Sequence, residues 1–151
     1  MSTHAAIAPA PRGRNPYDNE GVERGADGIA RYVERPASLV HMLRASVERD
    51  PGATAVLDVG GAALSYGELW EGAGRVAGGL RAAGVERGER VAIRLPNGIE
   101  WVLAFFGAEL AGAVVVPVNT RFTEGEVAYV VDDSGARFSF MPGEPLPDGA
   151  A

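Results

Sequence analysis

The feature that most constrains the fold of this chain is an alternation of strand-like and helix-like segments between Ala53 and Phe140. Short apolar runs have the length of strands, and segments with helical periodicity separate them. The runs are 53–59, 91–95, 113–118 and 137–140. This alternation predicts an α/β fold, in which a layered sheet carries helices on both faces.

The helical segments have clear start and stop signals. Ser38 can cap a helix over 39–49, while Ser65-x-x-Glu68 and Thr123-x-x-Glu126 are capping-box patterns. Gly84 has the position of a left-handed residue that ends the second helix. The inner stripe of that helix is predicted to consist of Leu69, Ala73, Val76 and Leu80.

The sequence also makes predictions about the elements around these helices. Gly60-Gly61 is a signal for a two-residue hairpin turn, followed by a returning strand over 62–64. A helix near 99–111 is apolar around most of its circumference and is expected to be central. The run 113–118 is expected to be a strand buried on both faces, as in a parallel sheet.

Glycines inside the second helix resemble a nucleotide-binding signal only in spacing. Gly72-x-Gly74-x-x-Ala77 fits a dinucleotide fingerprint, but such glycines belong at a strand-to-helix turn. Here they lie well inside a helical pattern, so helix packing is the favoured explanation. Together with Gly78 and Gly79, they would let a neighbouring element approach closely.

Composition excludes several classes of function. The 14 basic residues are all arginine, the net charge is −6 and there is no cysteine. Disulfides and thiolate chemistry are therefore excluded, and nothing favours nucleic acid as a partner. Glu109 and Pro117 interrupt the apolar stretch 99–118, which argues against a membrane span. No secretory signal is visible, and a cytoplasmic location is expected.

Few side chains suggest chemistry. His4 and His41 have no second ligand at metal-like spacing, and Asp132-Asp133 is best explained by solvation at a helix end. Asn119 and Arg121 follow a predicted strand and could contact a ligand, although loop capping or a surface ion pair is favoured. The sequence therefore assigns no catalytic, cofactor-binding or metal-binding residue.

A series of short motifs resembles the adenylate-forming (AMP-binding) enzyme superfamily, which includes the acyl-CoA synthetases, or fatty-acid–CoA ligases. Their order and spacing match the early part of the family's N-terminal domain, and Leu110 departs from the lysine found in many relatives. The matching segments are 64–69, Gly84, 88–92, 95–97, 111–113, 116–119, Arg121 and 133–136.

The resemblance implies an incomplete N-terminal subdomain of an enzyme that uses ATP, Mg²⁺ and coenzyme A to convert a carboxylic acid to its acyl-CoA. The family's phosphate loop with its lysine, its later acidic motifs and its catalytic lysine have no counterpart here. This chain alone is therefore expected to bind no cofactor and to be inactive.

This interpretation divides the chain into a flexible tail (1–37), a partial AMP-binding-enzyme domain (38–140) and a loop or frayed end (141–151). The expected partner is the missing remainder of a synthetase, or a second copy that associates through exposed apolar surface. Two alternatives remain open. One is a stand-alone α/β binding module that docks on a full-length synthetase or another partner, and the other is a small enzyme that acts alone.

Overall fold

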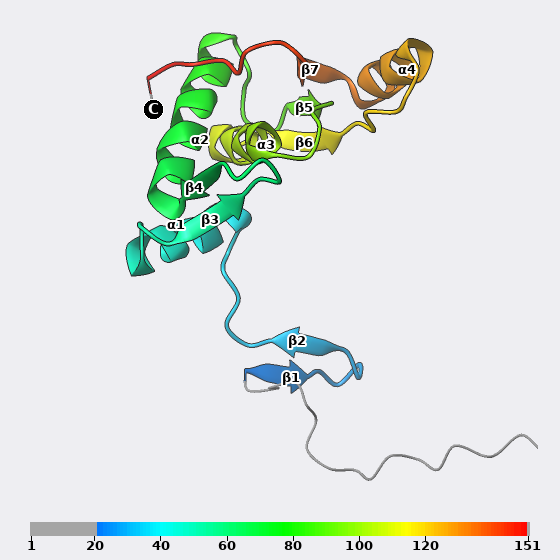
Figure 1. Ribbon diagram of the computed structural model, residues 1–151. Coiled ribbons are helices and arrows are strands. Elements are labelled where there is room, and N and C mark those ends of the chain that lie inside the picture. Colours follow the sequence, from blue (N-terminus) through cyan, green and yellow to red (C-terminus); the bar gives the residue numbers. More distant parts are fainter. Residues whose placement is uncertain (1–20, 151) are drawn as a thin grey trace, which may run out of the picture. The chain divides into compact units, whose positions relative to one another are not determined.

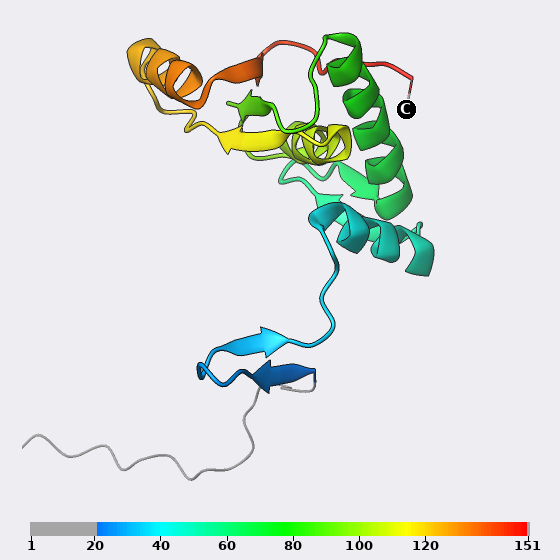
Figure 2. The same ribbon diagram turned by 180° about the vertical axis from the view of Figure 1, so that it is seen from behind.

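The computed structural model describes residues 21–150, which fall into two units that divide at Pro36 (Figures 1 and 2). The first unit contains an antiparallel hairpin of β1 (Val22–Arg24) and β2 (Ala30–Tyr32). Asp27 stabilises the loop of the hairpin, since its carboxylate accepts from the Ile29 N–H at 3.0 Å and pairs with Arg31 at 2.6 Å.

The sequence analysis predicts no strand in this first unit. The flexibility expected for 1–37 stays a prediction, and 1–20 lie outside the described residues.

The second unit contains the predicted alternation of helices and strands. Its elements are α1 (Leu39–Arg49), β3 (Thr54–Leu57), β4 (Ala63–Ser65), α2 (Tyr66–Ala82), β5 (Arg90–Ile93), α3 (Ile99–Ala111), β6 (Val114–Pro117), α4 (Glu124–Ser134) and β7 (Ala136–Phe140). None of the helices in residues 21–150 has both the length and the apolar character that a membrane span requires.

A three-stranded parallel sheet organises this unit, in the order β6-β5-β7. Side chains of the central strand β5 alternate between the two faces. Val91 and Ile93 belong to a large cluster with α2 and α3, whereas Ala92 packs with Val127 of α4 in a smaller cluster. The sheet therefore carries helices on both faces, as the sequence predicts.

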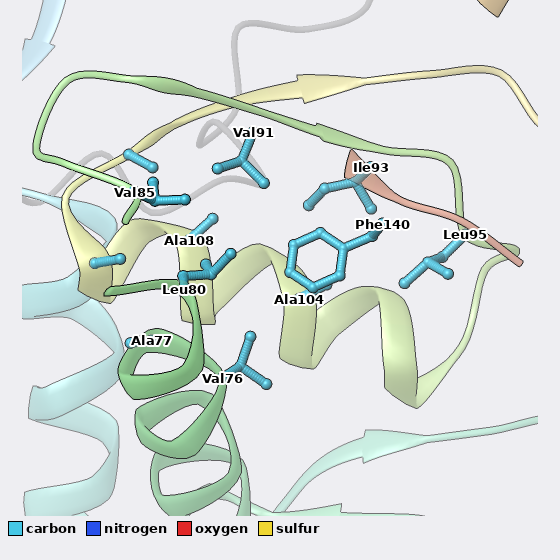
Figure 3. Packing of buried hydrophobic residues seen from close by; sticks show 12 residues of the cluster. Val76, Ala77, Leu80, Val85, Val91, Ile93, Leu95, Ala104, Ala108 and Phe140 are labelled. Atoms are coloured by element: carbon cyan, nitrogen blue, oxygen red, sulfur yellow. The ribbon is translucent and has the colours of Figure 1, made fainter. Parts of the chain in front are cut away.

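The large cluster forms the main core (Figure 3). Leu80 of α2 is fully buried, as are Val91 and Ile93 of β5. Phe140 of β7 is buried in the same cluster. Because these residues come from elements far apart in the sequence, burying their apolar surface holds the layers together. The predicted inner stripe of α2 is confirmed, since all four of its residues are buried.

The ends of α2 and α4 match the sequence signals. Both capping boxes are present: Ser65 and Thr123 accept from the third helical N–H, and Glu68 and Glu126 reach back to the cap residue. Gly84 has a φ of +83°, as expected of a left-handed residue after a helix.

The prediction that β6 is buried on both faces is wrong. The strand is parallel, as expected, but among residues 21–150 it pairs with β5 alone and lies at the edge of the sheet. Val114 remains 51% exposed. A run of valines indicates a strand of a parallel sheet, but it cannot tell an inner strand from an edge strand.

The prediction of a two-residue turn at Gly60-Gly61 is also wrong in detail. Asp58 N–H donates to the Ala62 carbonyl at 2.8 Å, so this hydrogen bond closes a loop of three residues, 59–61. Gly61 has a φ of +85° at the end of this loop, where a left-handed residue is required. The hairpin itself, with β3 antiparallel to β4, is as predicted.

Helix α3 has the predicted bounds and only partly the predicted burial. Its buried residues are small, and Gly107 lies directly against Val76 of α2. The buried residues are Ala104, Gly107, Ala108 and Ala111. The large apolar residues, including Trp101 and Phe106, are only half-buried. The helix therefore buries its small residues and leaves apolar surface partly open to solvent.

Candidate functional site

The carboxyl ends of β5 and β6 enclose a hollow of about 550 Å³. In open α/β sheets, ligands bind outside the carboxyl ends of the strands, so this edge is the candidate site of the fold. The hollow is lined by Leu95, Pro96, Asn97, Trp101, Pro117, Val118, Asn119 and Thr120. Val118 N–H donates to Ile93 at 2.9 Å, which joins the two chain segments where the strands end.

The loop after β6 is held by its own hydrogen bonds. The Asn119 side-chain oxygen accepts from the Arg121 N–H at 2.9 Å, and its carbonyl accepts from the Phe122 N–H at 3.1 Å. This is the loop-capping role that the sequence analysis favours for Asn119. Arg121 is exposed and does not line the hollow.

No ionisable side chain lines the hollow. Asn97, Asn119 and Thr120 can form hydrogen bonds, and the Trp101 ring stacks on Phe105 at 5.3 Å between centroids. Such a wall can bind a polar or flat group. General acid–base catalysis needs a titratable group in reach of the reacting atoms, which the lining residues do not offer.

Arg94 directly precedes the lining residue Leu95 in the sequence. Its Nη2 donates to the Phe122 carbonyl at 2.7 Å and ties the end of β5 to the loop before α4. Its Nε is buried without a hydrogen-bond partner. The side chain therefore positions a loop.

The other residues considered from the sequence have structural roles. His41 Nδ1 lies 2.8 Å from Ser38 Oγ at the start of α1, and Asp132 and Asp133 are exposed near the end of α4. Within residues 21–150 no group of three His, Cys, Asp or Glu side chains could hold a metal ion. His4 lies outside the described residues. That the chain carries no catalytic, cofactor-binding or metal residue stays a prediction.

Packing explains the first glycine of the α2 pattern. A Cβ at Gly72 would lie 2.6 Å from Leu103 of α3. The residues are inside the helix and away from any strand-to-helix turn. The preference for helix packing over nucleotide binding is confirmed for Gly72.

A second hollow, which we name the apolar groove, has a volume of about 530 Å³. Sequence analysis predicts exposed apolar surface in general but does not locate this groove. Side chains from three helices and one strand form it: Met42, Leu43, Ser46, Ala55, Val56, Leu57, Tyr66, Leu69, Val102 and Phe106. Leu57 is 72% exposed at its edge, so the groove is open to a partner of apolar character.

Comparison with known proteins decides the family. The sequence model of the family described as "AMP-binding enzyme" matches residues 43–150. The chain belongs to this family. Within it, the chain is 40% identical over 74 residues to long-chain-fatty-acid–CoA ligase FadD13 of Mycobacterium tuberculosis strain H37Rv, an alignment that covers 49% of this chain and 15% of the ligase. It is 48% identical over 86 residues to feruloyl-CoA synthase of an Amycolatopsis species, with 57% and 17% covered.

Solved structures of AMP-binding enzymes share the fold. The N-terminal domain of FACL13 from Mycobacterium tuberculosis aligns with a TM-score of 0.63 at 35% identity, over 66% of this chain and 26% of that domain. Apo MatB from Rhodopseudomonas palustris aligns with a TM-score of 0.64 at 32% identity, over 70% of this chain and 21% of MatB. The chain thus spans less than a fifth of the two curated relatives named above. The fold is that of an incomplete N-terminal subdomain of an adenylate-forming enzyme.

Proposed function

We propose that this chain is the N-terminal part of an ATP-dependent acyl-CoA synthetase and is inactive by itself. The complete enzyme would combine a carboxylic acid, ATP and coenzyme A to give acyl-CoA, AMP and pyrophosphate. Membership of the AMP-binding enzyme family supports this proposal, as do relatives named as fatty-acid–CoA and feruloyl-CoA ligases.

The observation that carries the proposed inactivity is the chemistry of the hollow at the carboxyl edge. Its lining has no ionisable side chain, and the chain has no lysine. Charge that develops on phosphoryl oxygens during adenylation must be stabilised by cations or by aimed hydrogen-bond donors. ATP, Mg²⁺ and coenzyme A would therefore be bound mainly by parts of the synthetase that this chain does not contain.

The proposed partner is the remainder of the synthetase, and the apolar groove is where we place part of that contact. Met42 and Leu57 are exposed beside it, and covering them would remove apolar surface from water. Association of two copies through the same surface is the second way to cover it. We place the protein in the cytoplasm, where the substrates of such a synthetase are present.

Acid-dependent exchange of pyrophosphate into ATP tests the proposal. The purified chain should give no exchange above the protein-free rate with aliphatic or aromatic acids. Exchange should appear when the chain is co-expressed with the part of a synthetase that follows this region in a full-length relative.

Two controls make the outcome decisive. The relative's own N-terminal segment, supplied in the same way, shows that the split enzyme can reassemble. If that control is active and this chain is not, the proposed role as a synthetase part is wrong and the stand-alone binding module gains support. Exchange by the chain alone would contradict the proposed inactivity.

A further inference from the structure

The last described residues of the chain lie against the C-terminal half of α2. Residues 146–150, which we name the strap, form no helix or strand and cross α2 in both views (Figures 1 and 2). Gly149 N–H donates to the Arg75 carbonyl of α2 at 3.1 Å. Leu146 packs against the main core cluster. The strap is thus fastened at one end by apolar contact and at the other by a backbone hydrogen bond.

Glycines on both sides make this contact possible. A Cβ at Gly79 would lie 2.6 Å from the Cβ of Pro147 and 2.9 Å from the backbone nitrogen of Asp148. A Cβ at Gly149 would lie 2.6 Å from the Gly79 nitrogen. Gly78 has no room either, because a Cβ there would collide with the Ala150 carbonyl. The backbone of α2 therefore meets the strap closely, and neither Gly78 nor Gly79 contributes a side chain to the contact.

The glycine pair is otherwise unfavourable for the helix. Glycine has a low helix propensity because it loses the most backbone entropy on ordering. A pair of adjacent glycines inside a helix that is nonetheless fully formed needs a compensating interaction. The strap supplies one, since it buries Gly78 and Gly79 completely enough that neither has space for a methyl group.

We propose that the Gly78-Gly79 step of α2 is a docking notch for an extended chain segment, and that the strap is its occupant in this protein. The notch selects its occupant by backbone shape. Pro147 packs against Gly79, and Gly149, two residues later, donates its N–H to the Arg75 carbonyl. Charge contributes little, because Arg75 and Asp148 approach only to 4.0 Å and both side chains are more than half exposed. This proposal goes beyond the role of the chain in a synthetase and does not depend on it.

Docking of the strap also shields the seam between α2 and α3. The strap roofs a small hollow of about 180 Å³ whose lining includes Val76, Leu103, Leu146 and Pro147. Val76 of α2 and Leu103 of α3 thus share this hollow with Leu146 and Pro147 of the strap. The strap is therefore a structural fastening of the helix pair, and any polypeptide joined after it would start beside α2.

Hydrogen exchange of the amide at position 149 tests the proposal in the full chain. In the wild type, this amide should exchange at least tenfold more slowly than a free amide, because it is bonded to Arg75. Gly79→Ala should remove most of that protection and speed release of the C-terminal residues by carboxypeptidase at least tenfold. Gly149→Ala should do the same while leaving α2 unchanged, which covers the case in which Gly79→Ala fails to fold.

Gly125→Ala is the matched control, since Gly125 lies in α4 with open space around its Cβ position. It should leave exchange at position 149 unchanged and raise the melting temperature slightly. The proposal is overturned if the wild-type amide at 149 is unprotected. It is equally overturned if Gly79→Ala retains the protection and raises the melting temperature as Gly125→Ala does.

Discussion

Val76 of α2 lies so close to the backbone of Gly107 on α3 that a Cβ at position 107 would meet its side chain. Both residues are buried between the two helices. Because Gly107 has no side chain, the Val76 side chain packs directly on its backbone and the two helix axes can approach closely. This fit lies within the most extensive helix–helix contact of the second unit.

Gly107→Ala should destabilise the protein by roughly 1–3 kcal/mol, because the added methyl overpacks the contact with Val76. Combining it with Val76→Ala should reduce that penalty, with a coupling of about 0.5–3 kcal/mol between the two sites. Urea unfolding of the wild type, both single variants and the double variant measures the coupling. If the effects of the two substitutions simply add, the contact does not limit the packing of α2 and α3.

Leu80→Ala should cost about 2–5 kcal/mol, since Leu80 is fully buried where α2 meets the sheet and its removal leaves a cavity. Leu57→Ala is the matched control, because Leu57 is mostly exposed. It should change the free energy of unfolding by less than about 0.5 kcal/mol. Equal effects of the two substitutions in thermal or urea unfolding would show that Leu80 is not part of the core.

The free energy of unfolding should decrease at acid pH because of the two capping boxes. Backbone hydrogen bonds from Ser65 and Thr123, followed by their hydroxyls, lower the pKa of Glu68 and Glu126 below the ordinary value of 4.5. A carboxyl with a lower pKa in the folded state stabilises that state fully above its unfolded pKa. The contribution is lost as the pH falls from 4.5 through the folded pKa.

Glu68→Gln and Glu126→Gln test this pH dependence. Urea midpoints of the wild type should exceed those of the variants well above pH 4.5, and the difference should shrink as the pH falls below it. Glu124→Gln is a control in the first turn of α4 that forms no capping box. A difference that stays constant down to the lowest pH would mean that ionisation of the cap carboxylates does not contribute.

The apolar groove should make the isolated chain associate at high concentration. Full burial of an exposed leucine is worth about 1.5–3 kcal/mol. Leu57→Ser and Met42→Ser should therefore weaken association about tenfold or more, while Tyr129→Ser on α4, outside the groove, should not. Sedimentation velocity over a range of concentrations measures this. Association that is insensitive to Leu57 and Met42 would place the contact elsewhere.

Signals that act within a few residues were sufficient to predict the helices. Both capping boxes and the left-handed Gly84 are where the sequence places them, and the bounds of α3 agree to the residue. A cap and the N–H that it accepts are three residues apart, so the sequence alone contains the whole interaction. The stripe of α2 was predictable from the helix itself, because helical periodicity places its four residues on one face.

Features that depend on distant residues could not be predicted in this way. The edge position of β6 follows from strand order, which is decided by how the segments before and after it pack. The hollow at the carboxyl edge is lined by the segments that follow β5 and β6. The valine run and the Asn119 loop belong to β6 alone, so they could not indicate that β5 ends beside it. The apolar groove requires α1, β3 and α3 together.

The sequence by itself determined the order of helices and strands in the second unit, the caps of its helices and the family to which the chain belongs. Those properties are fixed by short-range hydrogen bonds and by periodicity along the chain. Only the tertiary structure decided that β5 is the central strand, that the glycines of α2 receive Leu103 and the strap, and that apolar side chains of α1 and β3 stay open to a partner. Burial and close packing are properties of pairs of surfaces, and a single segment does not specify the surface that will cover it.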